Sequence, residues 1–153
     1  MSDNAQNTAG NDNVNQPAIM IHTQYIKDLS LEIPHAPEIF RGLNEAPAVS
    51  VHVDVDAQHM HDNFYNVSLK FRMDGDIKTQ KLFILELEYS AITSLQIPQE
   101  NLEPVLLVEI PRLIFPFARN VITNCLTEGG LPPFMLTPID FMSLYQQRNQ
   151  NKQ

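Results

Sequence analysis

Four stretches of the chain alternate hydrophobic and polar residues, which is the pattern of strands with one buried face. The clearest alternation covers residues 49–56, where valines occupy the odd positions and polar residues the even ones. Similar runs cover residues 19–33, 64–73 and 78–89. Asp74-Gly75-Asp76 carries the strongest hairpin signal between them. We therefore predict an antiparallel meander of four long strands, followed by a crossover at residues 90–99 where no period is clear.

The alternation also assigns a face to each strand residue. In the first run, Asp28 and Glu32 occupy even positions on a polar face, about 13 Å apart at roughly 3.3 Å per residue. The odd positions of that run carry Ile19, Ile21, Tyr25, Leu29, Leu31 and Ile33. In the fourth run, one face carries Phe83, Leu85, Leu87 and Tyr89, and the other carries Leu82, Ile84, Glu86 and Glu88.

Helical patterns follow the strands. Residues 109–130 begin with Pro111 in a position that suits a first turn and end at Gly129-Gly130, which suits a helix stop. Apolar residues cover more of this helix than the stripe of about 100° expected for a surface helix. The helix must therefore be covered from several sides, either by the chain's own core or by other subunits. Pro116 should kink it, and Thr137-Pro138-Ile139-Asp140 predicts the start of a second helix.

Composition places these elements in one domain. The chain has 153 residues, of which 43% are hydrophobic. Residues 1–18 are expected to be a disordered polar tail, residues 19–146 the folded domain, and residues 147–153 a polar C-terminal tail. The formal net charge of −8 argues against nucleic acid as a partner. No apolar run is long enough to insert in a membrane, and the single cysteine, Cys125, suits a reducing cytoplasm.

Candidate chemistry in the sequence is sparse. His59 and His61 share one face at a strand end and could begin a metal site, but only distant residues could complete it. Cys125 lies among apolar helix residues, which indicates an inert thiol. The sequence contains no phosphate-binding loop, and we predict neither an enzyme nor a cofactor. Phe40 and Leu43 are large apolar residues on a loop, which favours a groove that binds apolar segments.

Two stretches of the chain resemble the signatures of SecB, the bacterial protein-export chaperone. The first is Tyr25-Ile-Lys-Asp-Leu-Ser-Leu-Glu-Ile-Pro-His-Ala-Pro-Glu-Ile-Phe40. The second combines Leu113-Ile-Phe-Pro-Phe-Ala-Arg119 with Gly130-Leu-Pro-Pro-Phe-Met-Leu-Thr-Pro-Ile-Asp-Phe141. The resemblance runs from about Ile19 to Tyr145. It implies an α+β fold in which C-terminal helices pack on one face of the sheet, and a homotetramer formed as a dimer of dimers.

The resemblance also implies a function and a set of residues. SecB-like proteins act without ATP in the cytoplasm, hold unfolded precursor proteins in an export-competent state and deliver them to SecA. Carried over by motif, the SecA-binding residues are Asp28, Glu32, Ile84 and Glu86. The client groove would contain Phe40, with Leu43 and Phe83 as additions. The oligomer core would contain Leu85, Leu87, Ile114, Phe117, Val121, Ile122 and Cys125.

Two other hypotheses remain open from the sequence. The chain could be an oligomeric adaptor that binds a folded partner and has no chaperone activity. It could also be a metal-dependent enzyme that uses His59 and His61.

Overall fold

The computed structural model describes residues 17–152, so the predicted tail at residues 1–18 falls almost wholly outside the described part. Four antiparallel strands form one sheet: β1 (Ile19–Glu32), β2 (Ala48–His59), β3 (Phe64–Ile77) and β4 (Gln80–Leu95). Their order is β1-β4-β3-β2. The predicted four-strand meander is therefore wrong for β1, which pairs with β4 instead of β2 and gives a Greek-key order. Pro34 and Pro37 prevent continued pairing after β1, and the connection contains a short 3-10 helix, η1 (Glu38–Gly42).

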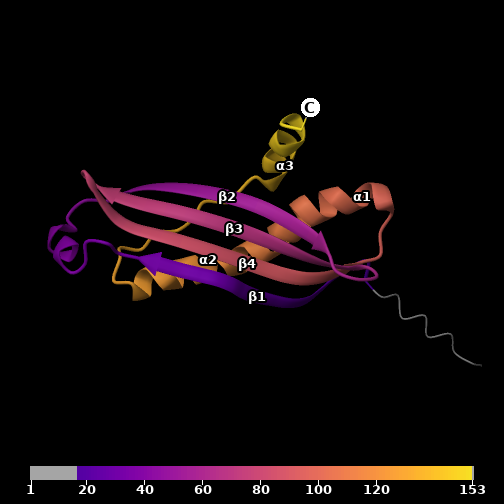
Figure 1. The fold of residues 1–153 in the computed structure, drawn as a ribbon, viewed down its shortest axis with the longest axis horizontal. Coiled ribbons are helices and arrows are strands. Elements are labelled where there is room, and N and C mark those ends of the chain that lie inside the picture. The colour runs from indigo at the N-terminus through magenta and orange to yellow at the C-terminus, as the bar shows by residue number, and fades with distance from the viewer. Residues whose placement is uncertain (1–16, 153) are drawn as a thin grey trace, which may run out of the picture.

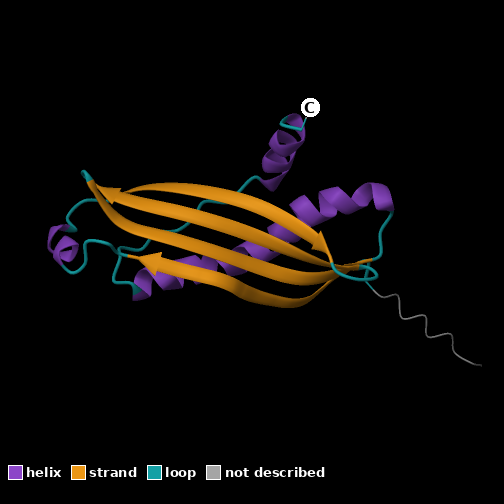
Figure 2. Ribbon diagram, viewed as in Figure 1, coloured by secondary structure: helices purple, strands orange, loops and turns teal. Residues whose placement is uncertain are grey.

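A long helical segment crosses one face of the sheet (Figures 1 and 2). It consists of α1 (Gln99–Pro104), the π-helical turn η2 (Val105–Glu109) and α2 (Ile110–Glu128). Pro111 lies in the first turn of α2, as predicted, but the preceding turn is also helical. Pro111 cannot donate a hydrogen bond, and its ring would crowd the carbonyl of Leu107 in a regular helix. The wide turn η2, in which the Ile110 N–H bonds the Val105 carbonyl, accommodates it.

The end of α2 is fixed by two hydrogen bonds. The Leu131 N–H donates to the Leu126 carbonyl at 3.1 Å, and the Gly130 N–H donates to the Thr127 carbonyl at 3.0 Å. Gly130 has φ +75°, which a residue with a Cβ adopts only at a cost. This is a Schellman motif, and the predicted stop at Gly129-Gly130 is confirmed, with Gly130 as the left-handed residue.

The core lies between α2 and the sheet face that we call the inner face. Phe115 of α2 connects the layers, because its ring lies 6.3 Å from that of Phe71 on β3 and 5.9 Å from that of Phe141. Most of the fully buried side chains come from β3, β4 and α2. They include Val67, Leu69, Met73, Leu85, Ile110, Ile114, Ile122 and Leu126.

The last helix, α3 (Phe141–Gln150), projects beyond the β2 edge of the sheet (Figure 1). Phe141 is buried at its first turn, and the Arg148 guanidinium donates to the Val55 carbonyl of β2 at 2.8 Å. The Asp140 carboxylate caps the helix by accepting from the Ser143 N–H at 3.0 Å. Helix α3 thus continues through the segment that the sequence assigned to a polar tail from residue 147, because Arg148 ties its last turn to the sheet.

Two irregularities in β1 change the faces that simple alternation predicts. The register shifts once between Ile21 and Thr23 and again between Ile26 and Asp28, which leaves His22 and Lys27 as extra residues. Between these bulges the odd and even positions exchange sides. Tyr25 therefore lies on the sheet face away from α2, where its hydroxyl donates to Asn66 at 2.8 Å. Its predicted inward orientation is wrong.

Two predictions about β3 and β4 are also wrong. Asp74-Gly75-Asp76 is not the hairpin turn: β3 continues to Ile77, and the chain turns at Lys78-Thr79. Gly75 instead lies beneath the Phe83 ring, where an added Cβ would come within 2.3 Å of Cε1. Strand β4 extends through the predicted crossover to Leu95. Leu82 is buried instead of facing away from the core, since the register shifts after Gly75.

Candidate functional site

The sheet face opposite α2, which we call the outer face, arranges charged residues in rows across the strands. One row places Glu32 beside Ile84, and Ile84 beside Asp74. The next places Ser30, Glu86, Arg72 and His52 side by side, and the third places Asp28, Glu88, Lys70 and Asp54 side by side. The four residues predicted to bind SecA, Asp28, Glu32, Ile84 and Glu86, therefore share one face on two adjacent strands.

Ion pairs neutralise part of this outer face. Arg72 Nη1 lies 2.7 Å from Glu86 Oε1, and Arg72 Nε lies 3.8 Å from Asp74 Oδ2. Lys27 Nζ lies 3.8 Å from Glu88 Oε1. Over residues 17–152, neither Asp28 nor Glu32 takes part in an ion pair. Within the described residues, Asp54 and Asp56 of β2 are also without ion pairs. The unpaired negative charge on this face therefore lies along its two edge strands, β1 and β2.

A shallow hollow of about 330 Å³ lies within the outer face. Val53, Phe71 and Leu87 contribute their backbone to its floor, because their side chains lie on the inner face. Charged and polar side chains form its rim. The rim residues are Asp28, His52, Asp54, Lys70, Arg72, Glu86 and Glu88. A depression of this kind, with acidic side chains on its rim, suits a partner that presents basic side chains.

An apolar cavity of about 270 Å³ lies at the end of the core, where the loop after α2 passes the sheet. Phe83 forms one wall and is only 2% exposed. The remaining lining comes from Ala46, Pro47, Val49, Leu82, Leu126, Leu131, Pro132, Pro133 and Phe134. Of the three predicted groove residues, the structure brings only Phe83 to this cavity. Leu43 is half-buried against the core, and the partly exposed Phe40 ring lies beside Gly130.

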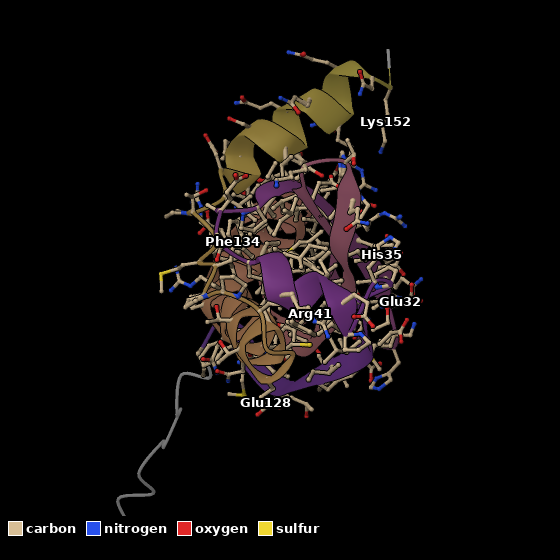
Figure 3. All side chains as sticks on the ribbon, turned by 90° about the vertical axis from the view of Figure 1, so that its left-hand side faces the viewer. Glu32, His35, Arg41, Glu128, Phe134 and Lys152 are labelled. Atoms are coloured by element: carbon tan, nitrogen blue, oxygen red, sulfur yellow. The ribbon has the colours of Figure 1, made fainter. Side chains whose placement is uncertain are left out.

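Sequence reasoning missed every residue of this cavity except Phe83, including the loop residues Pro132, Pro133 and Phe134. Their signal was present, because two prolines and an aromatic residue follow directly after the helix stop and fall within the second signature. Figure 3 views the molecule from the end that carries Arg41 and shows Glu32 and Phe134 on opposite sides. The charged outer face and the apolar cavity are thus separate surfaces of one sheet.

The predicted oligomer core divides into two groups. Leu85, Leu87, Ile114 and Ile122 are buried in the chain's own core between the sheet and α2. Phe117 is 54% exposed, and Val121 and Cys125 are partly exposed. Leu113 extends this stripe along α2 with 51% exposure. Burial, with a smaller contribution from the charge of Glu128, raises the pKa of the Cys125 thiol and makes it a poor nucleophile.

Strand β1 adds apolar surface on the same side as α2. Ile26 is opposite Tyr89 and Leu29 is opposite Leu87, so both side chains lie on the inner face. The chain's own helix nevertheless leaves them open, with Ile26 47% exposed. Together with Leu113 and Phe117, these residues give the helix side of the molecule an uncovered apolar surface.

The histidines considered as metal ligands have other contacts. His59 Nε2 lies 2.8 Å from the Asp62 carbonyl oxygen, and the His59 ring packs against Tyr65. His61 packs against Phe64 and lies 3.6 Å from the Asp62 carboxylate. Within the described residues, no three potential ligands come together in a way that could hold a metal ion. No helix in that part of the chain is long and apolar enough to span a membrane.

A charged sheet face and an apolar cavity on opposite sides of one sheet suit a protein of the binding class, with two separate contact surfaces. Residues 12–152 match the family described as preprotein translocase subunit SecB. The chain is 47% identical over 138 residues to the protein-export protein SecB of Rhodospirillum rubrum, covering 90% of this chain and 86% of that one. The corresponding protein of Paramagnetospirillum magneticum is 45% identical, with 86% of each chain covered. The chain belongs to the SecB family of protein-export chaperones.

The fold has a counterpart among solved structures. A SecB-like chaperone of Mycobacterium tuberculosis, solved in complex with an antitoxin peptide, superposes with a TM-score of 0.67. The two chains share 12% sequence identity, and the match covers 80% of this chain and 91% of the other. This likeness supports the four-stranded sheet and helix arrangement.

Proposed function

We propose that this chaperone holds unfolded precursor proteins in the cytoplasm without using nucleotide and delivers them to SecA. The observation that carries the proposal is the separation of an apolar cavity and an acidic outer face on opposite sides of one sheet. A client held on one side leaves the other side free for SecA. The proposed chaperone domain extends from residue 19 through α3, because Arg148 connects that helix to β2.

Client binding is proposed for the cavity between Phe83 and Phe134 and for the exposed Phe40 nearby. Apolar segments of an unfolded chain would gain by burying side chains against these residues, with little demand on sequence. The test is the refolding of a denatured precursor at saturating chaperone without nucleotide. We expect refolding to stop. Unimpeded refolding would refute the proposal, and binding of folded protein with no competition from unfolded chain would favour a simple adaptor.

SecA binding is proposed for Asp28, Glu32, Ile84 and Glu86, because a basic partner complements the three carboxylates and Ile84 lies beside Glu32 on the same face. Asp28→Ala combined with Glu86→Ala should weaken SecA binding, more visibly at low salt, and leave client binding intact. Asp56→Ala is the matched control, since Asp56 lies on the same face opposite Ser68 and outside the hollow. Equal loss of SecA and client binding in the double variant would refute the separation of the two surfaces.

Assembly as a dimer of dimers is proposed from the uncovered apolar surface. Leu113 and Phe117 on α2, and Ile26 and Leu29 on β1, lie on the helix side of the subunit. Strand β1 is also an edge strand with free backbone groups, which a second sheet can satisfy. Light scattering on a sizing column should give the mass of four chains. A monomer would contradict the proposed assembly.

A further inference from the structure

The outer face contains basic residues within its acidic surface. Strand β3 contributes Lys70 and Arg72 between the acidic residues of β4 and those of β2. Arg72 lies directly opposite Glu86 in the sheet, and its Nη1 is 2.7 Å from Glu86 Oε1. Glu86 is one of the residues proposed to bind SecA, so in the free subunit its carboxylate already has a cationic partner from the same chain.

A basic side chain of a docking protein must therefore share Glu86 with Arg72 or replace it. Both side chains of this pair are about half exposed. An exposed ion pair is weak and exchanges readily, because water and salt screen it. The arriving cation also meets repulsion from the Arg72 charge. Arg72 thus lowers the affinity of Glu86 for a basic partner without blocking access to it.

Arg72 has a second carboxylate within reach when the docking protein binds Glu86. Its Nε lies 3.8 Å from Asp74 Oδ2, next to it on the same face. Asp74 also pairs with Lys81, whose Nζ lies 3.6 Å from Asp74 Oδ1. Arg72 can release Glu86 and keep its contact with Asp74 while the docking protein binds Glu86. Asp28 differs from Glu86 in this respect, since it has no ion-pair partner within the described residues.

We propose that Arg72 is an internal competitor on the SecA-docking face, which pairs with both Glu86 and Asp74 in the free chaperone and releases Glu86 on docking while it keeps Asp74. The inference rests on the proposed function, because it concerns the same face. Its consequence is that the strength of docking is set by an internal competitor as well as by the acidic residues. SecA should bind first along the unpaired carboxylates of β1 and then displace Arg72.

The experiment measures the dissociation constant of purified SecA for the full-length chaperone at low and high salt. Arg72→Gln should tighten binding about two- to fivefold at low salt, the range expected for one exposed ion pair. The gain should shrink at high salt. Arg72→Lys keeps the charge and should bind as the wild type does. In a Glu86→Gln background, Arg72→Gln should give a much smaller gain, since the carboxylate that Arg72 occupies is gone.

The outcomes separate this inference from the proposed function. If SecA fails to bind the wild type, the proposed docking is wrong and this inference falls with it. If SecA binds the wild type and Arg72→Gln is unchanged or weaker, the docking stands and the competitor role of Arg72 is refuted. Arg72→Thr provides a second neutral side chain suited to a strand, in case the Gln variant does not fold.

Discussion

Gly75 allows the sharpest test of how the apolar cavity is built. An added Cβ would lie 2.3 Å from Phe83 Cε1 and 2.6 Å from Cδ1, whereas ordinary contacts begin at 3.4 Å. The Phe83 ring must therefore move by about 1 Å to admit one methyl group. The ring is buried in the core and forms one wall of the apolar cavity, so its displacement disturbs both. Overpacking of this kind costs about 1–3 kcal/mol, so Gly75→Ala should lower the free energy of unfolding by that amount.

The assay is thermal and urea unfolding at one fixed protein concentration, since assembly contributes to apparent stability. A loss of 1 kcal/mol corresponds to about 2–4 °C in Tm for a chain of this size. Gly42→Ala is the matched control, because no atom lies within 4 Å of the position that its added methyl group would take. It should change stability by about 0.5 kcal/mol or less. The displaced ring should also weaken client binding in Gly75→Ala alone.

A second substitution tests the cause. Phe83→Leu leaves room for the methyl group that Gly75→Ala adds, so the two changes together should cost less than the sum of their separate costs, by more than about 0.5 kcal/mol. Additive effects, or a Gly75→Ala variant as stable as Gly42→Ala, would refute the close-packing account of this glycine.

Three further outcomes follow from the structure. Phe117→Ser should leave the subunit folded but reduce the mass of the assembly measured on a sizing column. Met60→Ser is the control, because it also removes an exposed apolar side chain but at a turn, and it should keep the assembly. An intact Phe117→Ser tetramer would contradict the proposed interface. The backbone and side-chain hydrogen bonds from Ser143 hold the pKa of Asp140 below its usual value. The Asp140 carboxylate therefore stabilises the start of α3 fully above pH 3.8, and this contribution is lost as the pH falls through the lowered pKa. Amide exchange in α3 should rise there, but not in Asp140→Asn, which caps at every pH. Cys125, whose pKa is raised, should react with a thiol reagent more slowly than a free thiol at pH 7 and faster as the pH rises. A rapid reaction at pH 7 would contradict the raised pKa.

Most of the strands could be predicted from the alternation of residues, because burial of one face imposes a period of two. The pairing of β1 with β4 could not, since it depends on long-range contacts and not on local pattern. The end of β4 was missed because Ser90 and Ser94 give it no hydrophobic contrast, although Ser90 is buried and its hydroxyl bonds Ser68 at 2.8 Å. Asp74-Gly75-Asp76 suggested a turn because only the local sequence was considered. The role of Gly75 depends instead on the Phe83 ring across the hairpin.

The candidate site was predicted in part. Asp28, Glu32, Ile84 and Glu86 do share the outer face, as both the alternation and the family signature indicated. The ion pair between Arg72 and Glu86 could not be predicted, because the residues that lie opposite one another on neighbouring strands depend on the register of the sheet. The loop residues that line the cavity lack any periodic pattern. They reach Phe83 only because the loop after α2 passes the sheet there.

The two bulges of β1 have a consequence for how this surface tolerates changes in chain length. Each bulge inserts one residue, and the second restores the side exchange that the first introduces. Without His22 and Lys27, every remaining residue of β1 would keep its partner on β4. The strand can therefore lose a residue at either bulge while Asp28 remains opposite Glu88 and the acidic edge continues to face outward.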